Sequence, residues 1–357
     1  MQSLFPEGFI FIHSLYGLTW CELECAEKDV KVVHEKAVAE ALFAYNQIDS
    51  EIGRFVFDED IVPKYGVFYN GWRNYLLAKI LLIDSSFINY SRYVNQFESQ
   101  CESIAQALKE SKGFYLESYY AQAWPADMFV AMASLALHDR IFAPRYQALI
   151  SQWLQNVKAN LDSRTGLIPH AVNPVSNRPL EGPRGSSSGL IIKMLLEIDP
   201  AFAKQQFQQF RKYFVSTALG LPSVREYPEG STGSGDIDSG PVFLGVGFAA
   251  TIDALGLFSR FGFHKVDEEY YKTISAFGFV VKSKKQKKYL FGKMAMADAF
   301  IAWGRSFGLT SKDAVKTSLT SKGSLKFHIF SVLLIMGLWL VFLRKHLFGH
   351  KASGQES

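Results

Sequence analysis

The chain has 357 residues, of which 48% are hydrophobic and 15% are aromatic, and its formal net charge is +4 at pH 7. This length suits one large domain built from repeats, while the mild charge, without a basic face that carries stacking aromatics, argues against nucleic-acid binding. The cysteines, Cys21, Cys25 and Cys101, lack paired spacing, which excludes a disulfide framework and a zinc site and favours buried thiols.

Apolar helical stretches recur along the chain, and each begins beside a cluster of Gly, Pro, Trp or Ser. They begin near Gly8, Gly71, Trp124, Ser186, Gly240 and Gly292. More polar, amphipathic stretches alternate with them, at residues 27–47, 90–112, 143–161, 200–218 and 266–281. The apolar starts are separated by roughly 50 to 65 residues, a period longer than that of common solenoid repeats.

This alternation predicts an all-α fold. A helix that is apolar all round must be buried, whereas a helix with a charged face lies outside, so the pattern indicates an inner ring of helices wrapped by an outer ring. The sixth outer position is either filled by residues 310–322 or left open. An irregular helical bundle is the competing architecture, and residues 53–69 are the best candidate for a short β-hairpin on a connecting loop.

The C-terminal region contains an uncharged, apolar stretch at residues 327–343, which is followed by Arg344 and Lys345. A helix of this length without a polar face predicts a single transmembrane helix, with a buried core helix as the alternative. The expected organisation is a helical domain at 1–310, a linker at 311–326, the span at 327–343 and a short basic and polar tail at 344–357. No basic region precedes the first apolar stretch, so a cleaved signal peptide is not expected. The default is therefore a C-terminal membrane anchor with the large domain in the cytoplasm.

A run of lysines at residues 282–288 lies between the fifth polar stretch and the sixth apolar one. Charge runs of this kind usually form a solvated loop. With a membrane anchor nearby, contact with anionic lipid head groups is the second interpretation.

The segment 224–245 is the strongest candidate for chemistry. Three carboxylates, Glu226, Asp236 and Asp238, lie in a glycine-rich loop that leads into an apolar helix. Glycines let the backbone adopt positive φ and approach a ligand closely. Asp238 or Ser239 could cap the following helix, but capping cannot use all three carboxylates at once. A surplus acid beside other acids would have a raised pKa and could act as a general acid.

Two short motifs, together with the helix alternation, resemble the six-hairpin or (α/α)6-toroid superfamily, which includes glycoside hydrolases, polysaccharide lyases and the linalool dehydratase/isomerase type. The motifs are Asp162-Ser-Arg-Thr-Gly-Leu-Ile-Pro-His170, similar to a D-x-x-T-G-L loop between hairpins, and Trp124-Pro-Ala-Asp127 at a helix start. The likeness covers about residues 5–307. It implies an active site where the inner helices begin, with acids and aromatics projecting into a central funnel.

On this interpretation the catalytic candidates are Asp127, Glu226, Asp236 and Asp238, and the substrate-binding candidates are Tyr69, Asn70, Trp72, Trp124, His170, Arg184 and Tyr227. Each also has a structural explanation. Asp127 can stabilise the first turn of its helix, and His170 can be a packing residue. Arg184 can bind a substrate anion or pair with Glu181. The acids of the loop could instead bind calcium, although no metal and no cofactor are expected.

The leading functional hypothesis is a membrane-anchored hydrolase or lyase that uses paired carboxylates as general acid and base on a carbohydrate-like substrate, either a small molecule or an oligosaccharide. A dehydratase or isomerase of an isoprenoid or lipid alcohol is the enzymatic alternative, and it predicts a funnel lined by Phe, Leu and Met. A non-catalytic scaffold that binds a ligand or partner is the third hypothesis. It predicts acids that are separate from one another and satisfied by helix-terminal amides.

Overall fold

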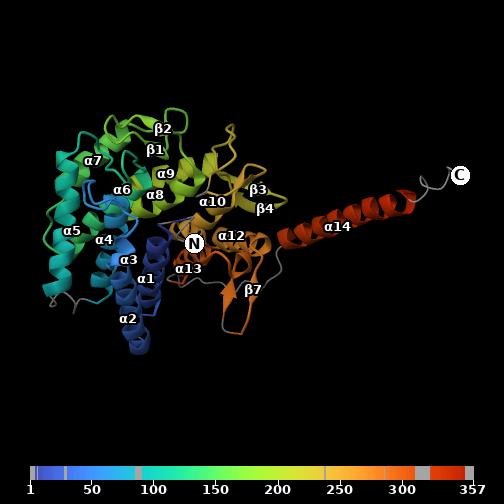
Figure 1. Cartoon of the computed structure of the whole chain (residues 1–357), viewed down its shortest axis with the longest axis horizontal. Coiled ribbons are helices and arrows are strands. Elements are labelled where there is room, and N and C mark those ends of the chain that lie inside the picture. Colours follow the sequence, from blue (N-terminus) through green and yellow to red (C-terminus); the bar gives the residue numbers. More distant parts are fainter. Residues whose placement is uncertain are drawn as a thin grey trace.

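The computed structural model describes residue 5 and residues 7–27, 30–84, 91–236, 239–284, 286–309 and 322–349. Within them, six helices form an inner ring (Figure 1): α1 (Gly8–Ala26), α4 (Gly66–Ile83), α6 (Pro125–Ile141), α8 (Gly185–Ile198), α10 (Phe248–Asp253) and α13 (Ala295–Ser306). Each contacts the next in this order, and α13 returns to contact α1, so the ring is closed.

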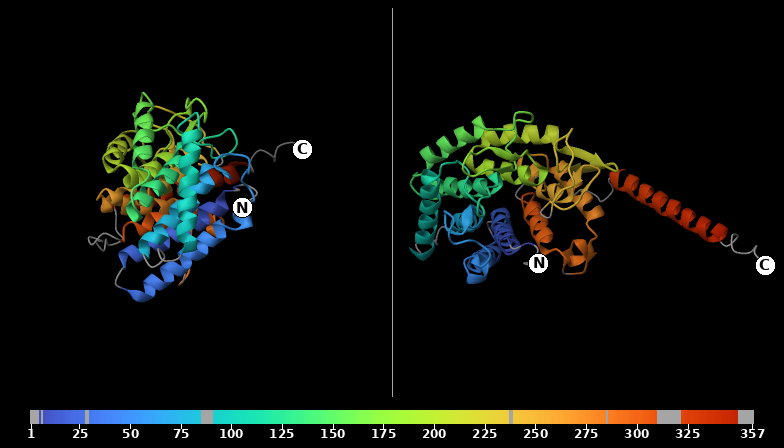
Figure 2. Two further views of the ribbon diagram at one scale, coloured as in Figure 1. Left: turned by 90° about the vertical axis from the view of Figure 1, so that its left-hand side faces the viewer. Right: turned by 45° about the horizontal axis from the view of Figure 1, so that its top comes forward.

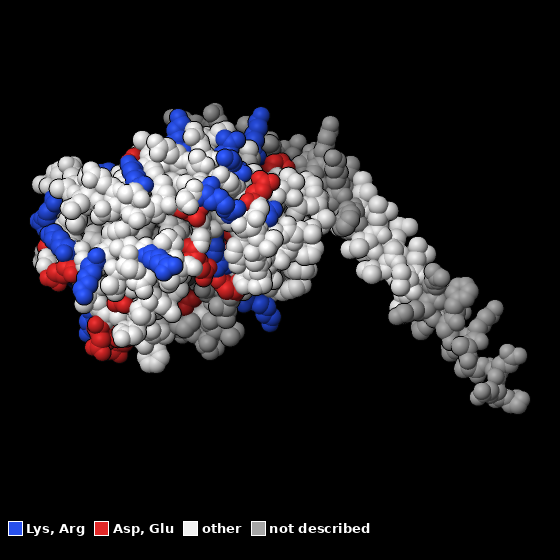
Figure 3. All heavy atoms as spheres, turned by 90° about the horizontal axis from the view of Figure 1, so that it is seen from above, with Lys and Arg blue, Asp and Glu red and all other residues white. Residues whose placement is uncertain are grey.

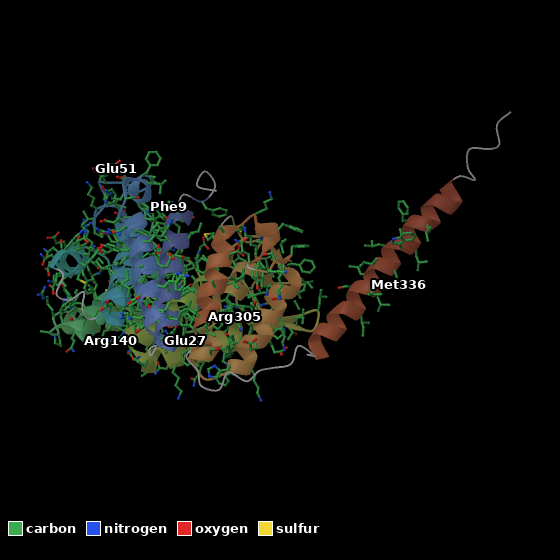
Figure 4. All side chains as sticks on the ribbon, turned by 90° about the horizontal axis from the view of Figure 1, so that it is seen from below. Phe9, Glu27, Glu51, Arg140, Arg305 and Met336 are labelled. Carbon is green, nitrogen blue, oxygen red and sulfur yellow. The ribbon has the colours of Figure 1, made fainter. Side chains whose placement is uncertain are left out.

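The inner helices run parallel to one another. Residues near the start of one helix contact residues near the start of its neighbour, and residues near its end contact residues near the neighbour's end. The Phe11 ring of α1 lies 5.1 Å from Phe68 of α4 and 5.3 Å from Phe300 of α13. At the other end, Arg140 of α6 donates to the side chain of Glu197 of α8. Figure 4 shows Phe9 at one edge of the body and Glu27 and Arg140 at the opposite edge. The six inner helices therefore begin on the same side of the ring.

Five outer helices run back along the ring: α2 (Lys31–Ile48), α5 (Ser91–Glu110), α7 (Gln147–Ala159), α9 (Pro200–Tyr213) and α12 (His264–Phe277). The pairing of α1 with α2 is antiparallel, since Glu24 lies 3.2 Å from His34 while Tyr16 donates to Glu40 at 2.8 Å. Helix ends follow local chemistry. Pro125 opens α6 with its preset φ, and the Asp199 carboxylate caps α9 by accepting from the Phe202 amide at 3.0 Å.

Short antiparallel hairpins occupy the connections from an outer helix to the next inner one. They are β1 (Ala171–Val172) with β2 (Pro179–Glu181), β3 (Val215–Ala218) with β4 (Leu221–Val224), β5 (Val242–Phe243) with β6 (Val246–Gly247), and β7 (Val281–Lys282) with β8 (Lys287–Lys288). Because each precedes the start of an inner helix, all lie at the end of the ring where the inner helices begin. The remaining helical segments are α3 (Glu51–Arg54), α11 (Leu257–Arg260), the 3-10 turn η2 (Leu290–Gly292) and α14 (Lys322–Gly349).

Aromatic side chains fill the ring. Trp72 of α4 is fully buried, and its indole lies 5.4 Å from the Phe11 ring and 6.3 Å from Trp303. These edge-on contacts bury large apolar areas between three inner helices. The outer surface carries both signs of charge, and Figure 3 shows Lys and Arg interspersed with Asp and Glu on one face.

Buried ion pairs join the ring at the end opposite the hairpins. Lys79 of α4 lies 3.0 Å from Glu22 of α1 and 3.8 Å from Glu197 of α8, and Arg260 lies 3.6 Å from Glu22. Burial disfavours the Lys79 charge, but Glu22, Tyr75 and Glu197 outweigh it and raise the pKa of Lys79 above its usual value. The network therefore links helices that are far apart in sequence.

Asp267 of α12 provides a pH-dependent contribution to stability. Its buried carboxylate accepts from the Gly256 amide at 2.7 Å, and burial raises its pKa from 3.8 to about 6. Since the folded state holds this proton more tightly than the unfolded chain, the group favours folding most below about pH 4, and this advantage is lost as the pH rises through 6. Ionisation of the buried Asp267 carboxylate then lowers the free energy of unfolding by about 3 kcal/mol.

Asp267→Asn retains the acceptor for Gly256 without the charge, so it is expected to be more stable than the wild type at about pH 7.5 and to lose this advantage at about pH 4. Urea unfolding of both proteins at the two pH values measures the difference. Asp60→Asn, which removes an exposed carboxylate, serves as the control. The same difference in unfolding free energy at both pH values would contradict the assignment.

The predicted hairpin at 53–69 is wrong. After α3 the chain makes turns and bends, and α4 begins at Gly66, inside the region expected to form the second strand. Gly66 has φ 78°, and the Val67 amide that follows donates to the Glu117 carbonyl at 2.8 Å. This bond to a distant loop replaces local strand pairing.

The predicted transmembrane helix at 327–343 is also wrong, and so is the single-pass membrane localisation derived from it. Across the residues that the structure describes, no helix combines the length and the hydropathy needed to cross a bilayer. The uncharged stretch at 327–343 is also shorter than the roughly 20 residues that a span requires. Figures 1 and 2 show α14 leading away from the ring. The proposed linker and the sixth outer position lie mostly outside the described residues.

Candidate active site

Arg184 is the centre of a charged cluster where α8 begins. It is the residue before Gly185, and its side chain is buried. Its Nε donates to Glu226 Oε1 at 2.8 Å, its Nη1 to Asp236 Oδ2, and its Nη2 to Ser239 Oγ at 2.7 Å. One guanidinium therefore holds two carboxylates that are ten residues apart in sequence, in the geometry that suits its planar fork of donors. Its Nη1 also lies 3.4 Å from Glu181 Oε2, the structural pairing expected as an alternative.

Glycines bring the acidic loop to the start of α8. The Gly185 amide donates to the Glu226 carbonyl at 2.8 Å, and the Glu226 amide donates to the Gly245 carbonyl at 3.1 Å. A side chain at Gly185 would collide with the Arg225 carbonyl, and one at Gly247 would come within 2.6 Å of Glu226 Oε2. The close approach of three backbone segments thus requires glycine.

The two carboxylates have opposite electrostatic environments. Glu226 is fully buried; its Oε1 accepts from Arg184 and from Ser186 Oγ at 2.7 Å, while its Oε2 has no hydrogen-bond partner. Burial raises the pKa of Glu226, and Ser186 and Arg184 offset this only in part. For Asp236, whose side chain is 42% exposed, burial is outweighed by Arg184 and Ser239, which hold its pKa well below the usual range.

Two further predicted residues lie beside Arg184. The Arg184 guanidinium is 5.4 Å from the centre of the Tyr227 ring, a cation–π contact. His170 Nδ1 lies 2.9 Å from Ser187 Oγ in the first turn of α8. Burial and the charge of Arg184 lower the pKa of His170 to about 4, so its imidazole is neutral near pH 7.

Asp127 and Trp124 mark the neighbouring start of α6. The Val172 amide, two residues after His170, donates to the Ala123 carbonyl at 3.0 Å and so places the two loops side by side. Asp127 is buried in the first turn of α6, and the Trp124 ring makes an edge contact with Tyr119 at 5.6 Å.

The residues predicted from α4 have other contacts. Tyr69 donates to the Ile48 carbonyl at 3.1 Å, Asn70 donates to the Lys64 and Gly66 carbonyls, and Trp72 packs inside the ring. None of these contacts involves the Arg184 cluster. Asp238 lies outside the described residues.

Serines are the members of the cluster that sequence reasoning missed as site residues. Ser186 and Ser187 contact Glu226 and His170, and Ser239 accepts from Arg184 while its amide donates to Asp236 Oδ1 at 2.9 Å. The run of three serines after Arg184-Gly185 was the available signal. Within the described part of the chain, no group of three or more His, Cys, Asp or Glu side chains is arranged to hold a metal ion.

Comparison with known proteins identifies the fold. No protein-family model matches the sequence, and no curated protein matches it. Among solved structures, the chain is similar to an unsaturated glucuronyl hydrolase specific for heparin, with a TM-score of 0.55 and 12% identity over 86% of this chain and 88% of that one. It is also similar to the Lin0763 protein from Listeria innocua, with a TM-score of 0.53 and 10% identity over 87% of each chain.

These likenesses and the closed ring of parallel helices show that the chain has the six-hairpin, (α/α)6-toroid fold. The resemblance expected from the sequence is confirmed at the level of the fold.

Proposed function

We propose that this protein is a toroid enzyme, a hydrolase or lyase, that acts on a carbohydrate-like substrate by carboxylate acid–base chemistry where its inner helices begin. The observation that carries the proposal is the pairing of Glu226 and Asp236 on Arg184 with pKa values displaced in opposite directions. Displaced pKa values of this kind cluster at functional sites, and here they accompany a partly exposed, ionised Asp236 that is held beside a buried Glu226 by the same arginine. A glucuronyl hydrolase with the same fold supports a sugar as the substrate class.

The exposure of the acids suggests their roles. Asp236 is partly exposed and ionised, so it is the carboxylate placed to contact substrate as a base or to stabilise developing positive charge. Glu226 has no exposed surface, and it acts through Arg184 and Ser186 as a positioning residue. Asp127, at the adjacent helix start, is the candidate for the general acid.

The lining of the cluster favours a sugar over a terpenoid. Arg184, His170 and Tyr227 combine donors, a neutral imidazole and an aromatic face, which is the usual composition of a site for a polar ligand. A dehydratase of a lipid alcohol would need an apolar lining. The scaffold hypothesis is less well supported, because Glu226 and Asp236 share one arginine rather than being satisfied separately by helix-terminal amides.

The experiment compares Asp236→Asn and Asp127→Asn with the wild type on a panel of 4-nitrophenyl glycosides and uronic acid oligosaccharides. Loss of a catalytic carboxylate is expected to lower kcat about 100-fold on any substrate that the wild type turns over, with an unchanged Tm. The matched control is Asp60→Asn, an exposed carboxylate on the loop before α4. Wild-type rates in both Asp236→Asn and Asp127→Asn would refute the proposal.

A further inference from the structure

Two phenylalanine rings are exposed together beside the β7–β8 hairpin. Phe279 is 60% and Phe291 is 64% exposed, and their rings stack with centroids 5.0 Å apart at an interplanar angle of 24°. Val281, in β7, is also exposed. Together these side chains form an apolar surface that no described element of the ring covers.

The backbone holds this pair in place. The Phe291 amide donates to the Phe279 carbonyl at 3.1 Å, and the Leu290 amide donates to the Gly278 carbonyl at 2.6 Å. Phe279, Leu290 and Phe291 have φ values of 44°, 50° and 56°, in the left-handed region that residues with a side chain rarely adopt. Such strain is found where surrounding structure enforces it, and it clusters at binding sites.

Lysines lie on both faces of the hairpin, and Lys288 is the one beside the pair. Lys282 and Lys287 are direct partners across the hairpin, and like charges opposite one another destabilise a strand pair. Lys287 donates to Tyr271 at 2.7 Å and to Ser275 at 3.1 Å, which directs it toward α12. Lys288 lies against Gly292, next to Phe291. The nearby Asp298 accepts from the Tyr289 amide at 2.8 Å, so this acid already serves the backbone.

This surface lies at the same end of the ring as the Arg184 cluster. The hairpin connects α12 to α13, and α13 contacts α10, whose preceding loop carries Glu226 and Asp236. Figure 1 shows β7 at the edge of the body. A polymer long enough to cross this end of the ring would therefore contact both sites.

We propose that Phe279, Val281, Lys288, Phe291 and the exposed Lys293 that follows Phe291 by two residues, together the Phe–Lys patch, bind an acidic polysaccharide as an accessory site. Aromatic faces stack on the apolar faces of sugar rings, and the lysines pair with their carboxylate or sulfate groups. The inference rests on the proposed function, because it extends the substrate class from carbohydrate to an anionic polymer. Such a patch would also attract an anionic bilayer or a single-stranded nucleic acid. The test therefore compares binding of these two ligands with binding of the polysaccharide.

The test measures binding of the full chain to polygalacturonate by affinity electrophoresis, with pullulan as the neutral polymer. The variants are Lys288→Gln/Lys293→Gln and Phe279→Ser, and Tm confirms that each is folded. The dissociation constant for polygalacturonate should rise about tenfold in each variant, and wild-type binding should weaken with added salt. The matched control is Lys31→Gln, an exposed lysine on the outer helix α2.

Three results overturn the proposal: no binding of polygalacturonate by the wild type, equal binding by folded patch variants, or binding of pullulan with the same affinity. Preference for an oligothymidylate or for phosphatidylserine vesicles over polygalacturonate also overturns it. Asp236→Asn separates this inference from the proposed function. This variant should bind polygalacturonate as the wild type does while losing turnover, so a failure of catalysis and a failure of the patch give different results.

Discussion

Replacing Arg184 with methionine is expected to lower the free energy of unfolding by about 4 kcal/mol at neutral pH, because it leaves a buried carboxylate without its counter-charge. Glu226 is fully buried, and Arg184 is its charged partner at 2.8 Å. The loss of Arg184 also releases Asp236 and Ser239 from their bonds to the guanidinium. Urea unfolding monitored by circular dichroism measures the change.

A double-mutant cycle distinguishes this cause from simple loss of packing. Glu226→Met alone removes the other partner, and the double variant Arg184→Met/Glu226→Met removes the buried pair altogether. Because an apolar pair of similar volume avoids the desolvation cost, the double variant should be destabilised by much less than the sum of the two single changes. Additive losses would show that the ion pair is not the source of the effect.

The second large effect is expected at the opposite end of the ring. Lys79→Met removes the cation that lies between Glu22 and Glu197, and Glu22 is only 4% exposed. Arg260 remains near Glu22 at the longer distance of 3.6 Å. We expect a loss of about 3 kcal/mol in the free energy of unfolding, measured by the same urea titration.

Lys31→Met is the matched control for this change. Lys31 is paired with Glu35 on α2, but both side chains are well exposed, so the pair should contribute almost nothing. A similar loss in Lys31→Met and Lys79→Met would contradict the view that burial makes the Lys79 network important.

The ring could be predicted from the sequence because its signal is periodic and repeated. The apolar starts near Gly8, Trp124 and Ser186 correspond closely to α1, α6 and α8. The D-x-x-T-G-L loop forms a turn, in which Asp162 Oδ1 accepts from the Thr165 amide at 2.8 Å. The start near Gly240 is less accurate, because residues 242–247 pair as β5–β6 and α10 begins only at Phe248.

The candidate site was predicted in part. Arg184, Glu226, Asp236, Tyr227 and His170 meet because several glycines allow loops from different hairpins to approach closely, and composition indicated such a loop. The pairing itself could not be read from the sequence, since spacing does not reveal which acid lies opposite which base. The burial of Trp72 could not be predicted either, because a tryptophan near the start of a helix can face either a funnel or a packed core.

The hairpins in the described part of the chain lie at one end of the ring, which separates the proposed ligand site from the packing that stabilises the fold. The packed aromatic interior and the ion pairs at the far end do not depend on the lengths of the hairpin loops. Surface connections tolerate insertion far better than packed helices do. The same scaffold can therefore be adapted to a new ligand by exchanging a hairpin such as β5–β6, while the helices that support it keep their sequence.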